Sequence, residues 1–370
     1  MSFLALDWRK AFDSISPPAL YDALRRIGIP VHYVEMVASL MDGRQFFVED
    51  HDSKSSSRPQ LSGISQGCTL SPLLFIILMS MLMQDAISML SPGARQAYGT
   101  RDLADITFAD DTLLLGVSAE HLSEFLRVVS EAGARYGLEL HYGKLQLMQV
   151  RNQDKVYKPE GQQIPAQHSM TYLGTLLSDD GQISSELGRR IGVAKSEFIA
   201  LSKVWRHSAL TRQRKLFLFS SLVESKLLYA LSCACLTVAE QRRLNGFQVK
   251  CIRQIWGIKP SYWSRVSNVE VLRLAGHRSA TTLLDLQQLQ FLGRILRQPE
   301  SGPLRAASFR KVGGVIQPVN SQFVRRIGRP RKEWVRTVLD IAYGITGGSE
   351  QLCAAASDAN AWKRYLQSRL

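Results

Sequence analysis

The sequence is poor in cysteine, and its cysteines are widely spaced. They are odd in number and include no Cys-x-x-Cys pair with a second such pair downstream: Cys68, Cys233, Cys235, Cys251 and Cys353. Structural zinc sites and disulfide frameworks use paired spacings. The pattern therefore argues against both, and it favours reduced thiols in an intracellular protein.

Long hydrophobic runs are also missing. The longest is LLFIILMSMLM, residues 73–83, whereas a membrane-spanning helix needs roughly 20 apolar residues. We expect this run to form a buried core helix. Asp7, Arg9 and Lys10 lie within the first ten residues, so we expect no secretory signal there. No membrane partner is expected.

Acidic residues are scarce in the second part of the chain. Residues 1–150 hold 12 Lys and Arg against 17 Asp and Glu, and residues 151–370 hold 34 against 15. The net charge of +14 over 370 residues therefore originates in the C-terminal part. Such a basic excess favours a nucleic-acid partner. The alternative is a generally basic, solvated surface.

Hydrophobic periodicity and turn residues predict two parts. The first mixes strands at 3–8, 105–108, 112–116 and 138–150, a strand-rich segment at 42–67, helices at 16–30, 71–90 and 118–137, and a hairpin at 170–181. After about Gly181 the pattern is helical, with a capping-box signature at Thr237 and Glu240. The tryptophans of this part, among them Trp263, are expected in the core, with stacking platforms as the alternative.

Two adjacent acids, Asp110 and Asp111, interrupt DITFADDTLLLG, and Asp7 ends another predicted strand. We expect both strands beside the acidic turn to be apolar and turned away from solvent. Neighbouring carboxylates repel one another, and burial makes ionisation costlier. Divalent cations would offset the charge, because Mg²⁺ prefers hard oxygen ligands. The alternative is a plain turn, since Asp is a common turn residue.

Five motifs follow one another along the first part of the chain. They are LALDWRKAFDSI, GISQGCTLSPLLF, FADD, GLELHYGKLQLM and YLGTLLSDDG. In this order they resemble the palm motifs and primer-grip region of reverse transcriptases from non-LTR, LINE-type retrotransposons, over residues 3–181. Residues 183–334, ending in GRPRKEW, resemble the thumb and downstream region of such elements more loosely.

The resemblance implies an α+β fold. A right-hand polymerase palm, with a ferredoxin-like antiparallel sheet and packed helices, would occupy residues 1–181. A helical thumb and connection would follow at 182–300, and a basic C-terminal region at 301–370. The implied activity is RNA-directed DNA polymerisation with two Mg²⁺ ions, or Mn²⁺ in their place. The implied partners are an RNA template, a DNA primer and deoxynucleoside triphosphates. The expected setting is intracellular, and the basic run at 325–332 resembles a nuclear-localisation signal.

The same resemblance assigns residue roles. Asp7, Asp110 and Asp111 correspond to the catalytic metal ligands, joined by the backbone carbonyl of Trp8. Lys144 corresponds to a lysine that protonates the leaving pyrophosphate, with a solvated strand-edge lysine as the alternative.

Nucleotide and nucleic-acid contacts are implied as well. Phe12 would press on the sugar of the incoming nucleotide, or pack in the core, and Gln66 and Gly67 would lie beside nucleotide and template, or form an ordinary turn. Tyr172 and Gly174 would hold the primer end. The basic residues Arg326, Arg329 and Arg331 would bind nucleic acid, with a solvated tail as the alternative.

The sequence also departs from the family pattern. Thr69 replaces a proline, and His141 and Leu145 replace the usual Asn and Thr of the fourth motif. The fingers region that precedes the first motif in the family is expected to be missing, since Asp7 is the seventh residue. We therefore expect weak nucleotide binding by this chain alone. The competing hypotheses are a truncated, inactive retroelement remnant that only binds nucleic acid and, less favoured, a relative of splicing maturases.

Overall fold

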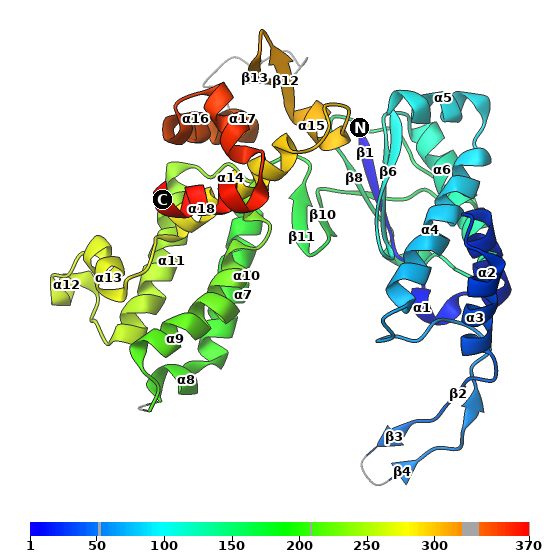
Figure 1. Ribbon diagram of the computed structural model, residues 1–370, viewed down its shortest axis with the longest axis horizontal. Helices are drawn as coiled ribbons and strands as arrows, with labels where there is room; N and C mark the ends of the chain where they lie inside the picture. Colours follow the sequence, from blue (N-terminus) through cyan, green and yellow to red (C-terminus); the bar gives the residue numbers. More distant parts are fainter. Residues whose placement is uncertain (51–52, 208, 320–332, 370) are drawn as a thin grey trace. The chain divides into compact units, whose positions relative to one another are not determined.

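The computed structural model describes residues 1–50, 53–207, 209–319 and 333–369, and the chain divides into two compact units, Met1–Gln182 and Ile183–Leu370 (Figure 1). Each unit is described by itself below. The division into palm, thumb and basic region at residues 181 and 300 stays a prediction.

A five-stranded sheet forms the centre of the first unit, in the order β6-β7-β1-β8-β9. Its strands are β1 (Ser2–Leu6), β6 (Leu103–Phe108), β7 (Asp111–Gly116), β8 (Gln146–Gln149) and β9 (Ala166–Gln167). The first four strands are antiparallel to their neighbours, and the short β9 runs parallel to β8. The antiparallel strands have the order of a ferredoxin-like sheet, and helices connect β1 to β6 and β7 to β8 in sequence. The predicted α+β fold is therefore confirmed.

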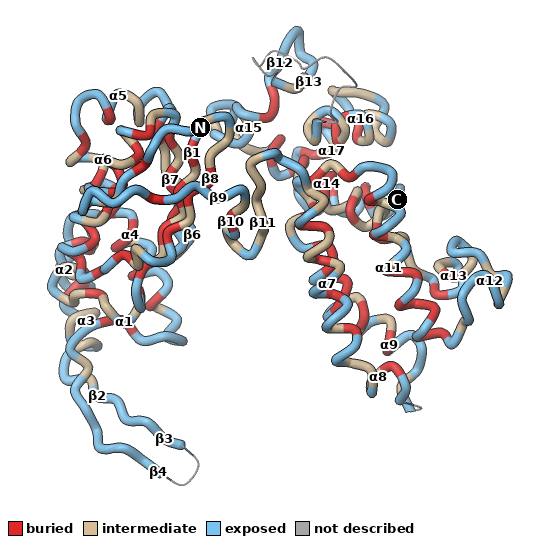
Figure 2. The backbone as a smooth tube through the Cα atoms, turned by 180° about the vertical axis from the view of Figure 1, so that it is seen from behind, coloured by how far each residue is buried: buried red, intermediate tan, exposed pale blue. Residues whose placement is uncertain are grey.

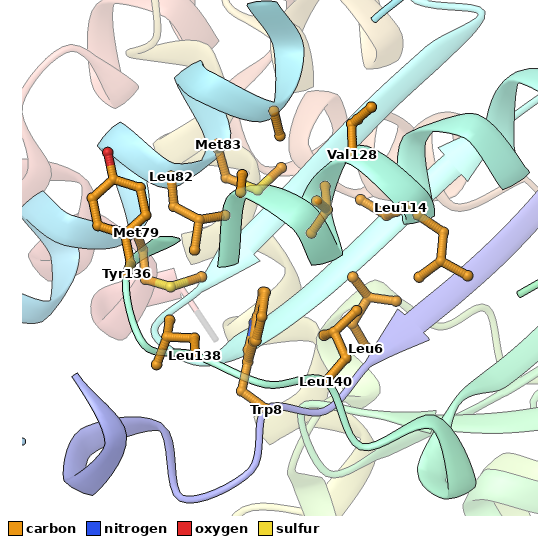
Figure 3. Close-up of a cluster of buried hydrophobic side chains, with 14 of the residues drawn as sticks. Leu6, Trp8, Met79, Leu82, Met83, Leu114, Val128, Tyr136, Leu138 and Leu140 are labelled. Carbon is orange, nitrogen blue, oxygen red and sulfur yellow. The ribbon is translucent and has the colours of Figure 1, made fainter. Parts of the chain in front are cut away.

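Two long helices cover one face of this sheet. α4 (Ser71–Ser88) and α6 (Ala119–Arg135) pack on each other, and Figure 3 shows Leu82 of α4 and Val128 of α6 in one buried cluster with Leu6 and Leu114 of the sheet. α4 is long and apolar enough to cross a membrane. Its Leu78 and Leu82 are fully buried in the core of this unit, so the predicted core helix is confirmed.

Shorter elements surround this core. They are α1 (Ala11–Ser14), α2 (Pro17–Arg26), α3 (Val31–Met41), β2 (Gln45–Phe46), β3 (Glu49–Asp50), β4 (Ser53–Lys54), β5 (Arg58–Pro59), α5 (Pro92–Thr100), β10 (Ser169–Tyr172) and β11 (Thr175–Ser178). The predicted strand at 138–150 is wrong over its first half. A 3₁₀ turn at Tyr142–Lys144 precedes β8, because Leu138 and Leu140 are buried against the helical layer and the chain must turn before it enters the sheet.

The second unit is mainly helical, as predicted. Its helices are α7 (Ser184–Ala200), α8 (Ser202–Arg206), α9 (Arg212–Phe219), α10 (Ser225–Leu228), α11 (Val238–Trp256), α12 (Ser261–Ser264), α13 (Asn268–Ala275), α14 (Ala280–Leu296), α15 (Pro303–Ser308), α16 (Trp334–Thr346), α17 (Ser349–Ala356) and α18 (Ala359–Arg369), with a π-turn at Ser220–Glu224, a 3₁₀ turn at Leu231–Cys233 and a hairpin of β12 (Phe309–Val312) and β13 (Val315–Pro318). The capping box at Thr237 and Glu240 begins α11 as predicted.

Two apolar clusters hold this unit together. One joins α7, α9, α11 and α13, and the other joins α14 to the C-terminal helices; Figure 2 shows buried residues along α7, α11 and α14. In the second cluster the indole Nε1 of Trp362 donates to the carbonyl of Leu289 at 2.8 Å. Apolar burial therefore crosses residue 300, and residues 333–369 pack on α14.

Candidate active site

Asp7 lies immediately after β1, at a position fixed by backbone pairing. Trp8 forms an isolated antiparallel bridge with Leu140, and His141 N donates to the carbonyl of Asp7 at 2.8 Å. The Trp8 side chain is buried, and its Nε1 donates to Thr112 Oγ1 at 3.4 Å. The aspartate is thus held at the end of a central strand, with its carboxylate beside the neighbouring strand β7.

The predicted acidic turn is a two-residue hairpin turn. Phe108 pairs with Asp111, so Ala109 and Asp110 form the turn itself, and Ala109 has a φ of 53°, in the left-handed region that is costly for a non-glycine residue. Leu6 pairs with Thr112. Continuing this antiparallel register by one residue places Asp7 opposite Asp111, where side chains across two strands lie close together.

The strands beside the turn differ in exposure. β7 is buried from Thr112 to Leu114, as expected. The expectation is wrong for β6, whose Ile106 and Phe108 are 50% and 64% exposed. β6 is the edge strand of the sheet, so only one of its faces and one of its edges are covered. The acidic turn therefore lies at an open margin of the sheet.

The three carboxylates influence one another. The pKa of Asp111 is raised, first by partial burial and then by the negative charges of Asp110 and Asp7. Lys144, at the end of the 3₁₀ turn, places Nζ 3.1 Å from Asp7 Oδ2. One cation therefore faces a group of three acids, and the site keeps an excess of negative charge.

An open cavity of about 510 Å³ lies against these groups. Its lining includes Asp7, Asp111, Lys144 and Tyr172, together with Gln146, Gln167 and Thr171. The last three residues were not predicted, since nothing in the strand pattern separates them from ordinary surface positions. Asp110 projects from the hairpin turn and is exposed.

The β10–β11 hairpin forms one wall of this cavity. Tyr172 Oη donates to the carbonyl of Ile106 at 3.1 Å, and Thr171 N donates to Gln146 Oε1 at 3.0 Å. The hairpin turn consists of Leu173 and Gly174, both with positive φ. Burial, and then the charge of Asp111, raises the pKa of Tyr172. The predicted primer-holding residues are thus anchored beside the acidic residues.

The predicted nucleotide-binding residues occupy a neighbouring segment. Phe12 is partly buried and stacks on Phe75, with ring centroids 4.4 Å apart and planes at 11°. Gln66 and Gly67 form an exposed turn before α4. Among the described residues, these three are not part of the lining of the 510 Å³ cavity. Phe12 therefore has the packing role that was its alternative, and its contact with a nucleotide stays a prediction.

Gly63, at the start of the same segment, is a position that motif matching did not single out. Its N donates to the carbonyl of Ile15 at 2.8 Å, and Ile64 N donates to that of Phe12 at 2.7 Å. Gly63 has a φ of +81°, and a Cβ there would lie 2.6 Å from backbone atoms of Asp13. A glycine is therefore required for the Gln66–Gly67 turn to be held against α1.

The predicted metal ligands are of a suitable chemical type, although their three carboxylates do not come together around one point. In the described part of the chain, no three Asp, Glu, His or Cys side chains come close enough together to hold a metal ion. Asp7 and Asp111 nevertheless share a cavity, and their oxygens are the hard donors that Mg²⁺ prefers. The pKa of Asp111 is raised first by burial and then by the negative charges of Asp110 and Asp7. These residues fit divalent cations in donor type and charge.

The predicted basic contacts have different outcomes. Arg326, Arg329 and Arg331 lie outside the described residues. Within the helical unit, Arg190 and Lys215 are buried, and Arg190 Nε lies 2.5 Å from Glu186 Oε1. Basic residues of this unit thus include structural ones, and charge alone does not identify a phosphate contact.

Comparison with known proteins gives the family. Residues 1–177 match the family model described as reverse transcriptase (RNA-dependent DNA polymerase). The chain is 30% identical over 150 residues to the retrovirus-related Pol polyprotein from type-2 retrotransposable element R2DM of Drosophila melanogaster, covering 40% of this chain and 14% of that protein. It is 26% identical over 270 residues to the probable RNA-directed DNA polymerase from transposon X-element of the same species, covering 69% and 28%.

A third relative is the RNA-directed DNA polymerase from mobile element jockey of Drosophila funebris, 23% identical over 283 residues, covering 72% of this chain and 29% of that protein. The chain thus spans less than a third of these relatives. Among solved structures, telomerase from Candida tropicalis with a fragment of telomeric RNA aligns with a TM-score of 0.39 and 13% identity, over 79% of this chain and 46% of that chain. Residues 1–177 therefore belong to the reverse transcriptase family, and the relatives place them in the class carried by non-LTR retrotransposons.

Proposed function

We propose that the first unit is the catalytic palm of an RNA-directed DNA polymerase that adds deoxynucleotides to a primer 3′-hydroxyl. The observation that carries this proposal is the register of the sheet, which brings Asp7 opposite Asp111 beside a tight turn containing Asp110. The family match of residues 1–177 supports the same activity.

In the proposed reaction, Asp7, Asp110 and Asp111 would hold two Mg²⁺ ions, or Mn²⁺ in their place. When bound, such ions acidify the attacking hydroxyl and stabilise the leaving pyrophosphate. The primer oxygen forms a bond to the α-phosphorus of the nucleotide as the bond to pyrophosphate breaks. Lys144 is placed to give a proton to the pyrophosphate, after its contact with Asp7 is exchanged for one with the nucleotide.

The remaining assigned residues hold the substrates. Tyr172 and Gly174, in the hairpin beside the cavity, support the primer end. Phe12, Gln66 and Gly67 face the nucleotide and template from the segment between α1 and α4. We propose an RNA template, a DNA primer and deoxynucleoside triphosphates as the substrates.

Primer extension on an RNA template tests this function. The assay uses the 370-residue chain with saturating nucleotides and Mg²⁺. Asp110→Asn and Asp111→Asn should each abolish incorporation, whereas Asp22→Asn, at an exposed position of α2, should leave it unchanged. Equal incorporation by the wild type and the two site variants would refute the assignment, and nucleic-acid binding without any incorporation would favour the inactive remnant.

A further inference from the structure

An exposed aromatic pair lies in the helical unit, on the short helix α12. Tyr262 and Trp263 are 72% and 73% exposed, with ring centroids 5.2 Å apart and planes at 88°. The expectation that this tryptophan lies in the core is wrong. The other five tryptophans are buried or partly buried, so the solvation of Trp263 distinguishes it from every other indole in the chain.

The segment that carries this pair is held firmly. Arg253, buried at the end of α11, donates to the carbonyl of Lys259 at 3.0 Å and to that of Val266 at 2.6 Å. It also reaches Ser264 Oγ at 3.4 Å and Asn268 Oδ1 at 3.1 Å. One guanidinium thus closes the loop from both ends, and the two rings project from a preorganised segment.

Positive charge flanks the rings. Lys259 and Arg265 are exposed, and the guanidinium of Arg265 lies 5.8 Å from the centre of the Tyr262 ring. The unit as a whole, residues 183–370, holds 31 Lys and Arg against 11 Asp and Glu. An exposed aromatic surface in such a field suits a ligand that has both flat faces and negative charge.

We propose that Tyr262 and Trp263 form a platform on which bases of single-stranded nucleic acid stack, with Lys259 and Arg265 contacting adjacent phosphates. Stacking on aromatic side chains next to cations is a general means of holding single strands without sequence preference. Paired bases offer no free faces, so the platform selects unpaired template or displaced strand. This inference rests on the proposed function in taking nucleic acid as the partner.

A protein partner fits these observations less well. The cores of protein interfaces are depleted in lysine. Here Lys259 precedes Tyr262 by three residues in sequence, and the Arg265 guanidinium lies 5.8 Å from the centre of the Tyr262 ring. The charge of the unit also opposes its close association with a second copy of itself.

The test measures binding without catalysis. The full chain in EDTA, without nucleotides, is titrated against labelled oligouridylate or oligothymidylate of about 20 nucleotides, longer than the roughly 4–16 nucleotides of a typical single-strand site. Trp263→Ala should raise Kd about 10-fold, and Trp263→Phe less than about threefold, because a phenyl ring still stacks. The melting temperature should not change, since the side chain is exposed.

Two further readouts separate stacking from charge. On an abasic oligonucleotide of the same length, wild type and Trp263→Ala should bind equally. Replacing both Lys259 and Arg265 with Gln should flatten the slope of log K against log salt by about 1.4, at about 0.7 per phosphate contact on a single strand.

The outcomes are distinct from those of the primer-extension assay. Unchanged oligonucleotide affinity in Trp263→Ala would overturn the platform, even if the chain extends primers. A change from dimer to monomer in that variant, with unchanged affinity, would overturn it too, and would assign the rings to a protein interface. Trp263-dependent binding by a chain that never extends a primer would support the platform and refute the polymerase.

Discussion

Asp7 and Lys144 form an ion pair, with Oδ2 and Nζ 3.1 Å apart, at the margin of the palm sheet. The two residues reach this contact from different elements, Asp7 from the end of β1 and Lys144 from the 3₁₀ turn that precedes β8. Both side chains are substantially solvated, so their attraction is screened and contributes little to stability. The contact matters because it places a proton donor next to a proposed metal ligand.

If Lys144 protonates pyrophosphate, its proton matters more than its charge. Lys144→Arg keeps a cation beside Asp7, but a guanidinium does not release its proton. We expect Lys144→Arg and Lys144→Met each to lower the single-turnover incorporation rate about 100-fold. Lys155→Met, at an exposed position, is the control. A Lys144→Arg variant with wild-type rates would show that only charge is needed there.

The raised pKa of Asp111 predicts a dependence of stability on pH. At a pH between the ordinary value of 3.8 and the raised pKa, Asp111 is protonated in the folded chain and ionised in the unfolded chain. The stability that this group contributes therefore falls as the pH rises through that interval. In EDTA at neutral pH, Asp111→Asn should therefore melt at a higher temperature than the wild type. The difference should vanish below about pH 4, where both forms are neutral.

Millimolar Mg²⁺ should reverse this order. An ion that binds only the folded state stabilises it by mass action, so Mg²⁺ should raise the melting temperature of the wild type more than that of Asp111→Asn. The exposed-site variant Asp22→Asn should respond as the wild type does. An equal response in Asp111→Asn would mean that Asp111 is not a metal ligand.

Gly63 and Gly67 form a matched pair for testing the segment before α4. Both have positive φ, but a Cβ at Gly63 would overlap Asp13, whereas one at Gly67 would meet nothing within 4 Å. Gly67→Ala should cost about 1 kcal/mol through backbone conformation. Gly63→Ala should cost more than about 2 kcal/mol, because the overlap adds to that penalty. Urea midpoints measure the difference, and similar values would refute the docking of this segment on α1.

The positions of Asp7, Asp110 and Asp111 at strand ends could be predicted from the sequence, because each lies at the end of an apolar run and such runs fix strands locally. The exposure of Ile106 and Phe108 could not, because an apolar pattern does not reveal which strand ends at the edge of a sheet. The exposure of Trp263 could not be predicted either, because it depends on the loop that Arg253 closes through hydrogen bonds at both ends. The need for Gly63 follows from a contact with Asp13 that is distant in sequence.

The buried polar network around Gln248 provides a last prediction, on the stability of the helical unit. Gln248 is fully buried; its Nε2 donates to Glu224 Oε1 at 2.7 Å and to the carbonyl of Arg278 at 3.0 Å, and its Oε1 accepts from Ala280 N at 2.8 Å. Gln248→Leu preserves approximate volume but removes these partners from buried groups. We expect a loss of about 2–3 kcal/mol in the free energy of unfolding, measured in urea. Gln254→Leu, exposed on the same helix, should change it by less than about 0.5 kcal/mol; equal effects of the two substitutions would show that the network contributes no net stability.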